Sequence, residues 1–175
     1  KEKLIIDPSP WSTYFGGTYY ENANSIVTDS NGNSYSTGYT YSVSNIATNG
    51  AFQSTHGGNN DGFISMFNEN GQLIWATYYG GNNNDYCYEI AITKQNNIII
   101  AGLTGSSIGI SSQNAFQDTL WGITDAFVVK FNNLGVRTWA TYFGGNLFDY
   151  GIGITSDQND NIVLSGYSNS VLGLT

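Results

Sequence analysis

One phrase occurs three times in this chain of 175 residues, always at the same interval. It reads WSTYFGG at Trp11–Gly17, WATYYGG at Trp75–Gly81 and WATYFGG at Trp139–Gly145, so successive copies begin 64 residues apart. A fixed period of this size is typical of repeat architectures, in which one structural unit buries its surfaces against copies of itself. The chain is therefore predicted to fold as an array of similar units.

The agreement between the copies extends well beyond this phrase. The same residue type returns at three further positions of each copy, namely Ile26, Ile90 and Ile154; Gly38, Gly102 and Gly166; Ser42, Ser106 and Ser170. The tripeptide Ala51–Gln53 also returns as Ala115–Gln117. No insertion or deletion is needed to keep this register, which indicates a true tandem repeat.

Each copy contains the signals of four short strands and no sustained helical periodicity. In the first copy we expect the strands at Ser25–Thr28, Ser34–Tyr39, Gly62–Phe67 and Leu73–Tyr79. Their equivalents in later copies are Ile98–Leu103, Ala126–Phe131, Val136–Phe143 and Ile162–Tyr167. Tight turns rich in Asn, Asp and Gly are predicted at Asp29–Asn33, Lys94–Asn97 and Asp157–Asn161.

Four antiparallel strands make one blade of a β-propeller. Runs such as Ile98–Ile100 are apolar on both faces, as a blade packed between two neighbours requires. We therefore predict an all-β fold of two full blades and half of a third, with a 64-residue repeat. The expected divisions are a lead-in at 1–10, the outer strand of a preceding blade at 11–17, blade 1 at 18–81, blade 2 at 82–145 and a partial blade 3 at 146–175.

A propeller closes with about four to eight blades, and an open stack would expose strand edges. We therefore expect the remaining blades to come either from a longer polypeptide or from other copies that complete the ring.

The recurring phrase itself has a structural interpretation. Tryptophan and the Thr-Tyr-Phe run suit an outer strand and its packing between blades. The glycine pair is expected to adopt positive φ and turn the chain from one blade to the next. The residues assigned this structural role are Trp11, Trp75, Trp139, Gly16, Gly17, Gly80, Gly81, Gly144 and Gly145.

Several separated motifs occur in a fixed order. W-x-T-Y-F-G-G is followed four residues on by an acid, then by D-x-x-G-N-x-Y-x-T-G-x-T-x-S at Asp29–Ser42, by A-F-Q, and by D-x-F-x-x-x-F-N-x-x-G. From Trp11 onward the chain resembles the seven-bladed β-propeller repeats known as SBBP repeats, although the later copies lose the Asp-x-x-Gly-Asn turn. The resemblance implies a large secreted or surface protein of Bacteroidetes type, and Leu4–Pro10 resembles the lead-in to such arrays.

Composition excludes several classes of partner. The net charge is −8 with only five Lys and Arg residues, which argues against binding nucleic acid or anionic lipid. No apolar run approaches the roughly 20 residues of a membrane span, so no membrane insertion is expected. Cys87 is the single cysteine and is expected to be a buried, inert thiol. No cofactor motif is present.

Two sets of acids could be read as metal ligands. Glu21, Asp85 and Asp149 share one position after the glycine pair and could form a cation-binding ring. A carboxylate that accepts backbone N–H bonds in the loop between blades is the favoured interpretation, because the acid recurs in every copy. Asp29–Asn33 resembles a calcium loop but lacks its downstream glutamate, so a hairpin turn is favoured.

The long connections Tyr41–Asn60 and Gly105–Thr124 are predicted to lie on the same face as the links between blades. Tyr41, His56 and Trp121 are the candidate binding residues, because none has a counterpart in the other loop. The competing interpretation is that such side chains pack on their own blade. Phe52 and Phe116, which belong to the shared Ala-Phe-Gln motif, are expected to point inward.

The sequence thus predicts a non-catalytic extracellular or bacterial cell-surface module that binds protein or glycan, displays loops or spaces domains, with adhesion as one use. His56 has no catalytic partner in sequence. One alternative is an accessory array of a polysaccharide-acting enzyme whose catalytic residues lie elsewhere. Another is a subunit of an extracellular assembly. Asp118–Leu120 matches a short acceptor pattern for O-glycosylation at Thr119 in Bacteroidetes.

Overall fold

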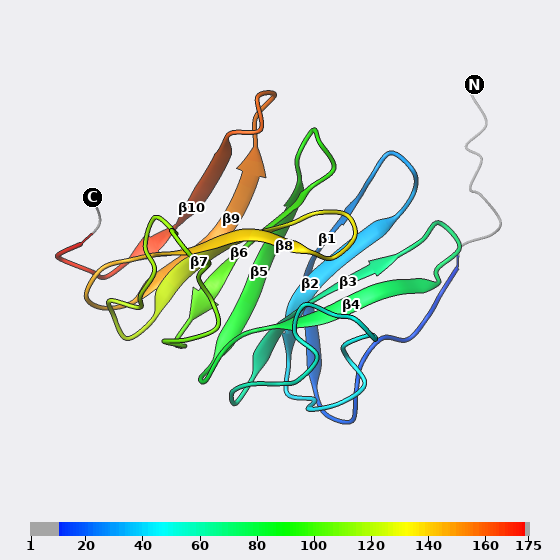
Figure 1. Ribbon diagram of the computed structural model, residues 1–175, viewed down its shortest axis with the longest axis horizontal. Helices are drawn as coiled ribbons and strands as arrows, with labels where there is room; N and C mark the ends of the chain where they lie inside the picture. Colours follow the sequence, from blue (N-terminus) through cyan, green and yellow to red (C-terminus); the bar gives the residue numbers. More distant parts are fainter. Residues whose placement is uncertain (1–10, 174–175) are drawn as a thin grey trace, which may run out of the picture.

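The computed structural model describes residues 11–173, and the predicted lead-in at 1–10 lies outside them. The described chain is all-β (Figure 1). Its first sheet contains β1 (Glu21–Thr28), β2 (Ser34–Thr40), β3 (Asp61–Phe67) and β4 (Leu73–Tyr79), in that order. The second contains β5 (Asp85–Ile92), β6 (Ile98–Thr104), β7 (Asp125–Phe131) and β8 (Arg137–Phe143), and the third pairs β9 (Asp149–Ser156) with β10 (Ile162–Ser168).

All neighbouring strands are antiparallel, and each sheet follows chain order from the inner strand outward. The predicted blades are therefore present, with two complete sheets and one sheet of two strands. The inner strands begin at the acidic residue, four residues earlier than the expected Ser25 start in the first copy. Residues 11–17 form no strand, and their assignment to a preceding blade stays a prediction.

The predicted turns occur where the sequence places them. The carboxylate of Asp29 accepts hydrogen bonds from the backbone N–H of Asn31 (2.9 Å) and Asn33 (3.0 Å), and Asp157 does the same in the third sheet. Burial alone would raise the pKa of Asp29, but these bonds outweigh it and hold the pKa below its usual value. The carboxylate is thus used by its own turn, as the hairpin interpretation requires.

We call the interface between the first two sheets the first joint, and that between the second and third sheets the second joint. The inner strands β1, β5 and β9 are successive neighbours across both joints. Isolated parallel bridges, Asn60 to Asn84 and Thr124 to Phe148, tie each third strand to the next inner strand. Every residue of β6 is buried because both faces of the middle sheet are covered, which confirms the prediction from Ile98–Ile100.

Each inner strand contains a β-bulge at the same place. The registers shift around Asn24 in β1, Tyr88 in β5 and Ile152 in β9. A bulge turns a side chain away from the regular alternation of a strand. The Asn24 side chain uses this position to donate a hydrogen bond to the Cys87 carbonyl of the next blade (2.7 Å).

The two edges of the molecule have different functions in the fold. The hairpin turns of β1–β2, β5–β6 and β9–β10 all lie on the upper side of Figure 1. The opposite edge contains the starts of the inner strands and the links between blades. The long loops begin there, because the backbone N–H of Tyr41 and of Gly105 bonds the chain just before β1 and β5. We call this the link edge; the predicted proximity of loops and links is confirmed.

Candidate functional site

The repeated acids are structural anchors of the link edge. Asp85, fully buried, accepts hydrogen bonds from the Ser106 hydroxyl and the Gly81 backbone N–H, each at 2.7 Å. Asp149 accepts the equivalent bonds from Ser170 (2.8 Å) and Gly145 (2.7 Å). Glu21 accepts from the hydroxyls of Thr40 and Ser42. All three residues open the inner strands rather than lying in loops. Asp85 and Asp149 accept a backbone N–H of the link between blades, as the favoured interpretation required, whereas Glu21, within the described residues, accepts only side-chain hydroxyls.

Each of these aspartates is paired with a second buried acid that the sequence argument did not single out. Asp61 opens β3 and accepts bonds from Gly57 N–H and the Gln53 amide, both at 2.8 Å. A Cβ placed on Gly80 would lie 2.6 Å from the Asp61 carboxyl carbon and 2.8 Å from Asp85 Oδ2. The two carboxylates therefore meet across the glycine.

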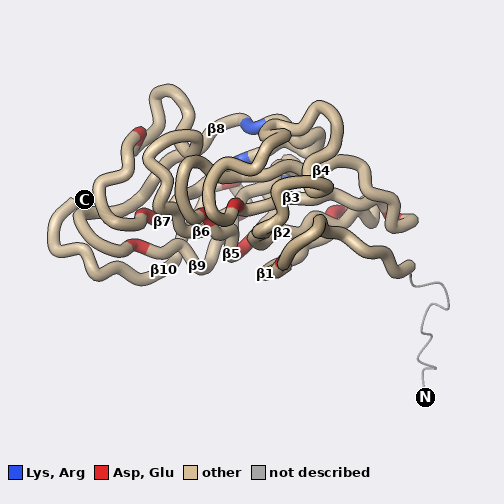
Figure 2. The backbone as a smooth tube through the Cα atoms, turned by 90° about the horizontal axis from the view of Figure 1, so that it is seen from below, with Lys and Arg blue, Asp and Glu red and all other residues tan. Residues whose placement is uncertain are grey.

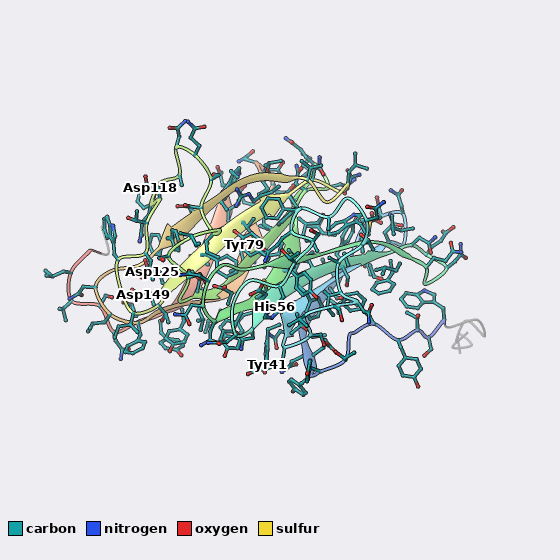
Figure 3. All side chains as sticks on the ribbon, turned by 60° about the horizontal axis from the view of Figure 1, so that its bottom comes forward. Tyr41, His56, Tyr79, Asp118, Asp125 and Asp149 are labelled. Carbon is teal, nitrogen blue, oxygen red and sulfur yellow. The ribbon has the colours of Figure 1, made fainter. Side chains whose placement is uncertain are left out.

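The second joint repeats this pair, with Asp125 and Asp149 on either side of Gly144, and Figure 3 shows the two aspartates next to one another. Burial raises the pKa of Asp85 to about 6, and the charge of Asp61 adds to the rise. Burial likewise raises the pKa of Asp125. Within residues 11–173 no group of three or more His, Cys, Asp or Glu side chains is arranged to hold a metal ion.

Positive φ, predicted for the glycine pairs, is found at Gly16 (φ 155°) but not at Gly17, Gly80, Gly81, Gly144 or Gly145, so the prediction is wrong for these five. The two later pairs act instead by close approach. A Cβ on Gly81 would lie 1.9 Å from the Ile108 carbonyl oxygen, and one on Gly145 would lie 2.1 Å from that of Leu172. The chain needs glycine there because the following loop crosses directly over it.

The repeated tryptophans pack between blades as predicted. Trp75 of β4 lies on the β7–β8 turn of the next sheet, where its indole N–H donates to the Asn133 carbonyl (3.1 Å). A Cβ on Gly135 would lie 2.9 Å from the same indole ring. Trp11 makes the corresponding contact with Gly71 and stacks on Phe67 at 6.0 Å between ring centroids. Trp139 packs against the cluster of Ile99, Ala101, Val128 and Ile154.

The three candidate binding residues have different surroundings. The His56 ring is half-buried, contacts Tyr78 edge-on at 5.6 Å between centroids, and has Nε2 3.3 Å from the Thr40 carbonyl oxygen. His56 therefore packs on its own blade, which is the competing interpretation. Trp121 is 57% exposed, and its indole N–H donates to the Thr119 hydroxyl (3.2 Å). Tyr41 is 44% exposed at the link edge, as Figure 3 shows.

Tyr41 belongs to a larger cluster that the sequence argument missed. Seven tyrosines from three blades lie on or beside the first two strands of their blades, and we call them the tyrosine ridge: Tyr20, Tyr39, Tyr41, Tyr86, Tyr88, Tyr150 and Tyr167. The ring centroids of Tyr39 and Tyr86 are 4.9 Å apart across the first joint. Tyr150 and Tyr167 stack at 4.4 Å within the third sheet.

The bulge residue of β5, Tyr88, extends the ridge along that strand. Tyr88 stacks on Tyr86 with 6.1 Å between centroids. Burial raises the pKa of Tyr88 to about 12. Four neighbouring phenols add to that rise: Tyr86, Tyr167, Tyr150 and Tyr39. The ridge tyrosines therefore come from all three sheets, with ring contacts across the first joint and within the third sheet.

Cross-strand pairing places ridge residues side by side within a blade. Tyr150 faces Tyr167 in the register of β9 and β10, and Tyr86 faces Leu103 in β5 and β6. The signal in the sequence was a tyrosine after the acid in the second and third copies, where the first copy has Asn22. These tyrosines become one surface only when the blades stack.

Cys87 and the apolar groove at the second joint are parts of the packing. The Cys87 thiol is fully buried and burial raises its pKa to about 12, which confirms the inert thiol. The groove is lined by Val128, Trp139, Ile162 and Leu164 among others. The equivalents of these four residues at the first joint are covered by β7 and β8, so this apolar part of the groove is a joint surface. Tyr150 and Tyr167 of the ridge also line the groove.

The geometry, four-stranded antiparallel sheets stacked face to face with one phrase at every link, defines a β-propeller repeat protein. Residues 11–46 match the family model of the SBBP beta-propeller repeat. This segment of the chain is therefore similar to the SBBP beta-propeller repeat, as its motifs indicated.

The chain is also similar to an uncharacterized WD repeat-containing protein of Acanthamoeba polyphaga mimivirus, 28% identical over 133 residues. That match covers 61% of this chain and only 9% of the relative. In the part of the chain that the structure describes, no helix has the length and apolar character needed to cross a membrane.

Proposed function

We propose that this chain is a non-catalytic binding module that acts outside the cell or on the cell surface and presents its link edge to a protein or a glycan. The observation that carries the proposal is the tyrosine ridge, an aromatic surface shared by three blades and flanked by the long loops. Tyrosine gives a large contact area at low cost in side-chain entropy, which suits binding surfaces.

The loops support the same proposal because their frame is constant while their exposed residues differ. Gln53 and Gln117 make equivalent bonds to Asp61 (2.8 Å) and Asp125 (2.6 Å). Trp121, by contrast, stands where the first loop has Gly57. A constant frame with variable tips is the arrangement that display of a binding surface requires. Only 10% of the residues are charged, and the single cysteine allows no disulfide within the chain; both are compatible with a location on the cell surface.

The test is capture of surface proteins and glycans from the source organism by the chain, compared with a Trp121→Ala variant and a Ser54→Ala variant. Trp121 and Ser54 are both exposed loop residues, but only Trp121 adds aromatic surface. We expect Trp121→Ala to weaken capture and Ser54→Ala to leave it unchanged. Equal capture by both variants, with no loss in variants of the ridge either, would contradict the proposal.

A further inference from the structure

The ridge tyrosines differ from the buried tyrosines in how their hydroxyls are used. The hydroxyls of Tyr78, Tyr79 and Tyr142 each donate to a backbone carbonyl at 2.8 Å. Within residues 11–173 no ridge hydroxyl donates to a protein acceptor; that of Tyr39 only accepts, from the Asn22 amide (3.2 Å). A donor left free beside an aromatic face is available to a ligand.

The ridge offers two kinds of contact in one narrow strip. Its ring faces are apolar, and its hydroxyls can donate and accept hydrogen bonds. Neighbouring centroids lie 4.4 to 6.4 Å apart along it. A sugar ring has the matching surfaces, with apolar C–H faces and a rim of hydroxyls. The strip crosses three blades, so it fits a linear chain better than a single compact ligand.

The distribution of charge around the ridge favours neutral glycan chains over anionic ones. Within the described residues the cations are Lys94, Lys130 and Arg137, at the turn ends of β5, β7 and β8, away from the ridge. The acids Asp85 and Asp149 begin the strands that carry the ridge, and Figure 2 shows acidic positions along this edge while the basic ones lie toward β8. An anionic polymer would meet repulsion with no cation to pair it.

We propose that the tyrosine ridge is a binding site for a neutral, linear glycan, an inference that rests on the proposed binding function and names its ligand class. Successive sugar units stack on tyrosines of successive blades, and the free phenol hydroxyls bond the sugar hydroxyls. Tyr86 and Tyr150 are equivalent residues of successive blades, so the site contains a repeated element. A polymer of identical units suits such a site.

The test is isothermal titration of the 175-residue chain with β-1,4-linked hexasaccharides of glucose, xylose and mannose. A galacturonic acid hexasaccharide, which has the same number of sugar units, serves as the anionic comparison. We expect binding of at least one neutral hexasaccharide, and a loss of about tenfold in affinity for Tyr86→Ala and for Tyr39→Ala. Tyr14→Ala is the matched control, because Tyr14 is fully exposed and lies outside the ridge.

Two further measurements distinguish a loss of binding from misfolding of the alanine variants. Tyr86→Phe and Tyr39→Phe keep the ring and are expected to bind within a fewfold of the unchanged chain. On that unchanged chain, the neutral hexasaccharide should shield Tyr86 and Tyr150 from nitration by tetranitromethane, but leave Tyr14 reactive. Shielding confined to other tyrosines would overturn the inference.

Two titration outcomes would also overturn it: no neutral hexasaccharide binds, or the galacturonic acid chain binds more tightly. If none of the four hexasaccharides binds while protein capture still depends on Trp121, the glycan is rejected as the ligand and the proposed binding function stands. Loss of both would count against the binding function itself.

Discussion

The two joints use equivalent residues but cover them differently. At the first joint Phe52 is 39% exposed, contacts Phe131 edge-on at 5.7 Å between centroids, and has the Arg137 guanidinium carbon 4.5 Å above its ring. At the second joint its equivalent Phe116 is 75% exposed and stacks only on Phe143 at 6.3 Å. The expectation that both rings point inward is wrong for Phe116, because the third sheet contains only β9 and β10 within the described residues.

The outer strands show the same contrast. Tyr79 is fully buried and donates to the Ile110 carbonyl (2.8 Å), whereas its equivalent Phe143 is 41% exposed. The comparison teaches that exposure of the outer-strand aromatics at the second joint marks an incomplete joint and not a binding surface. The tyrosine ridge is different in kind, because it is accessible at the first joint as well, where both sheets are complete.

The largest expected difference between the joints is at these outer-strand aromatics. Tyr79→Ala should lower the free energy of unfolding by about 3–5 kcal/mol, because it empties a filled core site and leaves the Ile110 carbonyl without its bond. Phe143→Ala should cost about 1 kcal/mol, since that ring is already partly in water. Urea titration of both variants measures the difference. Equal costs would mean that the second joint is closed in solution.

Substitution of the link glycines should also cost more unfolding free energy at the first joint than at the second, with a smaller difference between the joints. Gly81→Ala forces a Cβ against the Ile108 carbonyl and should cost about 3 kcal/mol. Gly145→Ala meets the Leu172 carbonyl, but that segment is mostly exposed and able to move, so about 1 kcal/mol is expected. Thermal unfolding of the two variants side by side makes the comparison. A larger loss for Gly145→Ala would show that the final loop is as firmly held as the first.

Sequence reasoning located the repeat, the blades, the strands within a few residues and the packing role of the tryptophans, because these follow from periodicity and from local turn chemistry. It assigned the wrong conformation to the two later glycine pairs, since a close approach by Ile108 or Leu172 depends on where a distant loop crosses. It also missed Asp61 as the partner of Asp85. The tyrosine ridge was out of reach for the same reason: Tyr39 and Tyr86 meet only when two blades stack.

The acid pair at the first joint makes stability depend on pH. The pKa of Asp85 is raised by burial from 3.8 to about 6, so the folded state favours the protonated acid more than the unfolded state does. Stability from this group is complete below pH 3.8 and is lost as the pH rises through about 6, a change on the order of 3 kcal/mol.

Melting temperatures measured from pH 4 to pH 7 should therefore fall with rising pH, and Asp85→Asn should flatten that slope. Asp118→Asn replaces an exposed acid and serves as the control. An unchanged slope in Asp85→Asn would assign the pH dependence to other acids of the joints.

The smallest expected effect concerns the tryptophans that seal each joint. Trp75→Phe removes the indole N–H that donates to Asn133 and should cost about 1 kcal/mol, of which the hydrogen bond is one part and the lost ring area the other. Trp139 makes no such bond to another group of residues 11–173, so Trp139→Phe should cost only the ring area. The indole N–H proton of Trp75 should exchange more slowly with deuterium than that of Trp139. Similar exchange rates would mean that the β7–β8 turn does not hold the Trp75 indole in solution. The two joints would then differ less at their outer strands than at their cores.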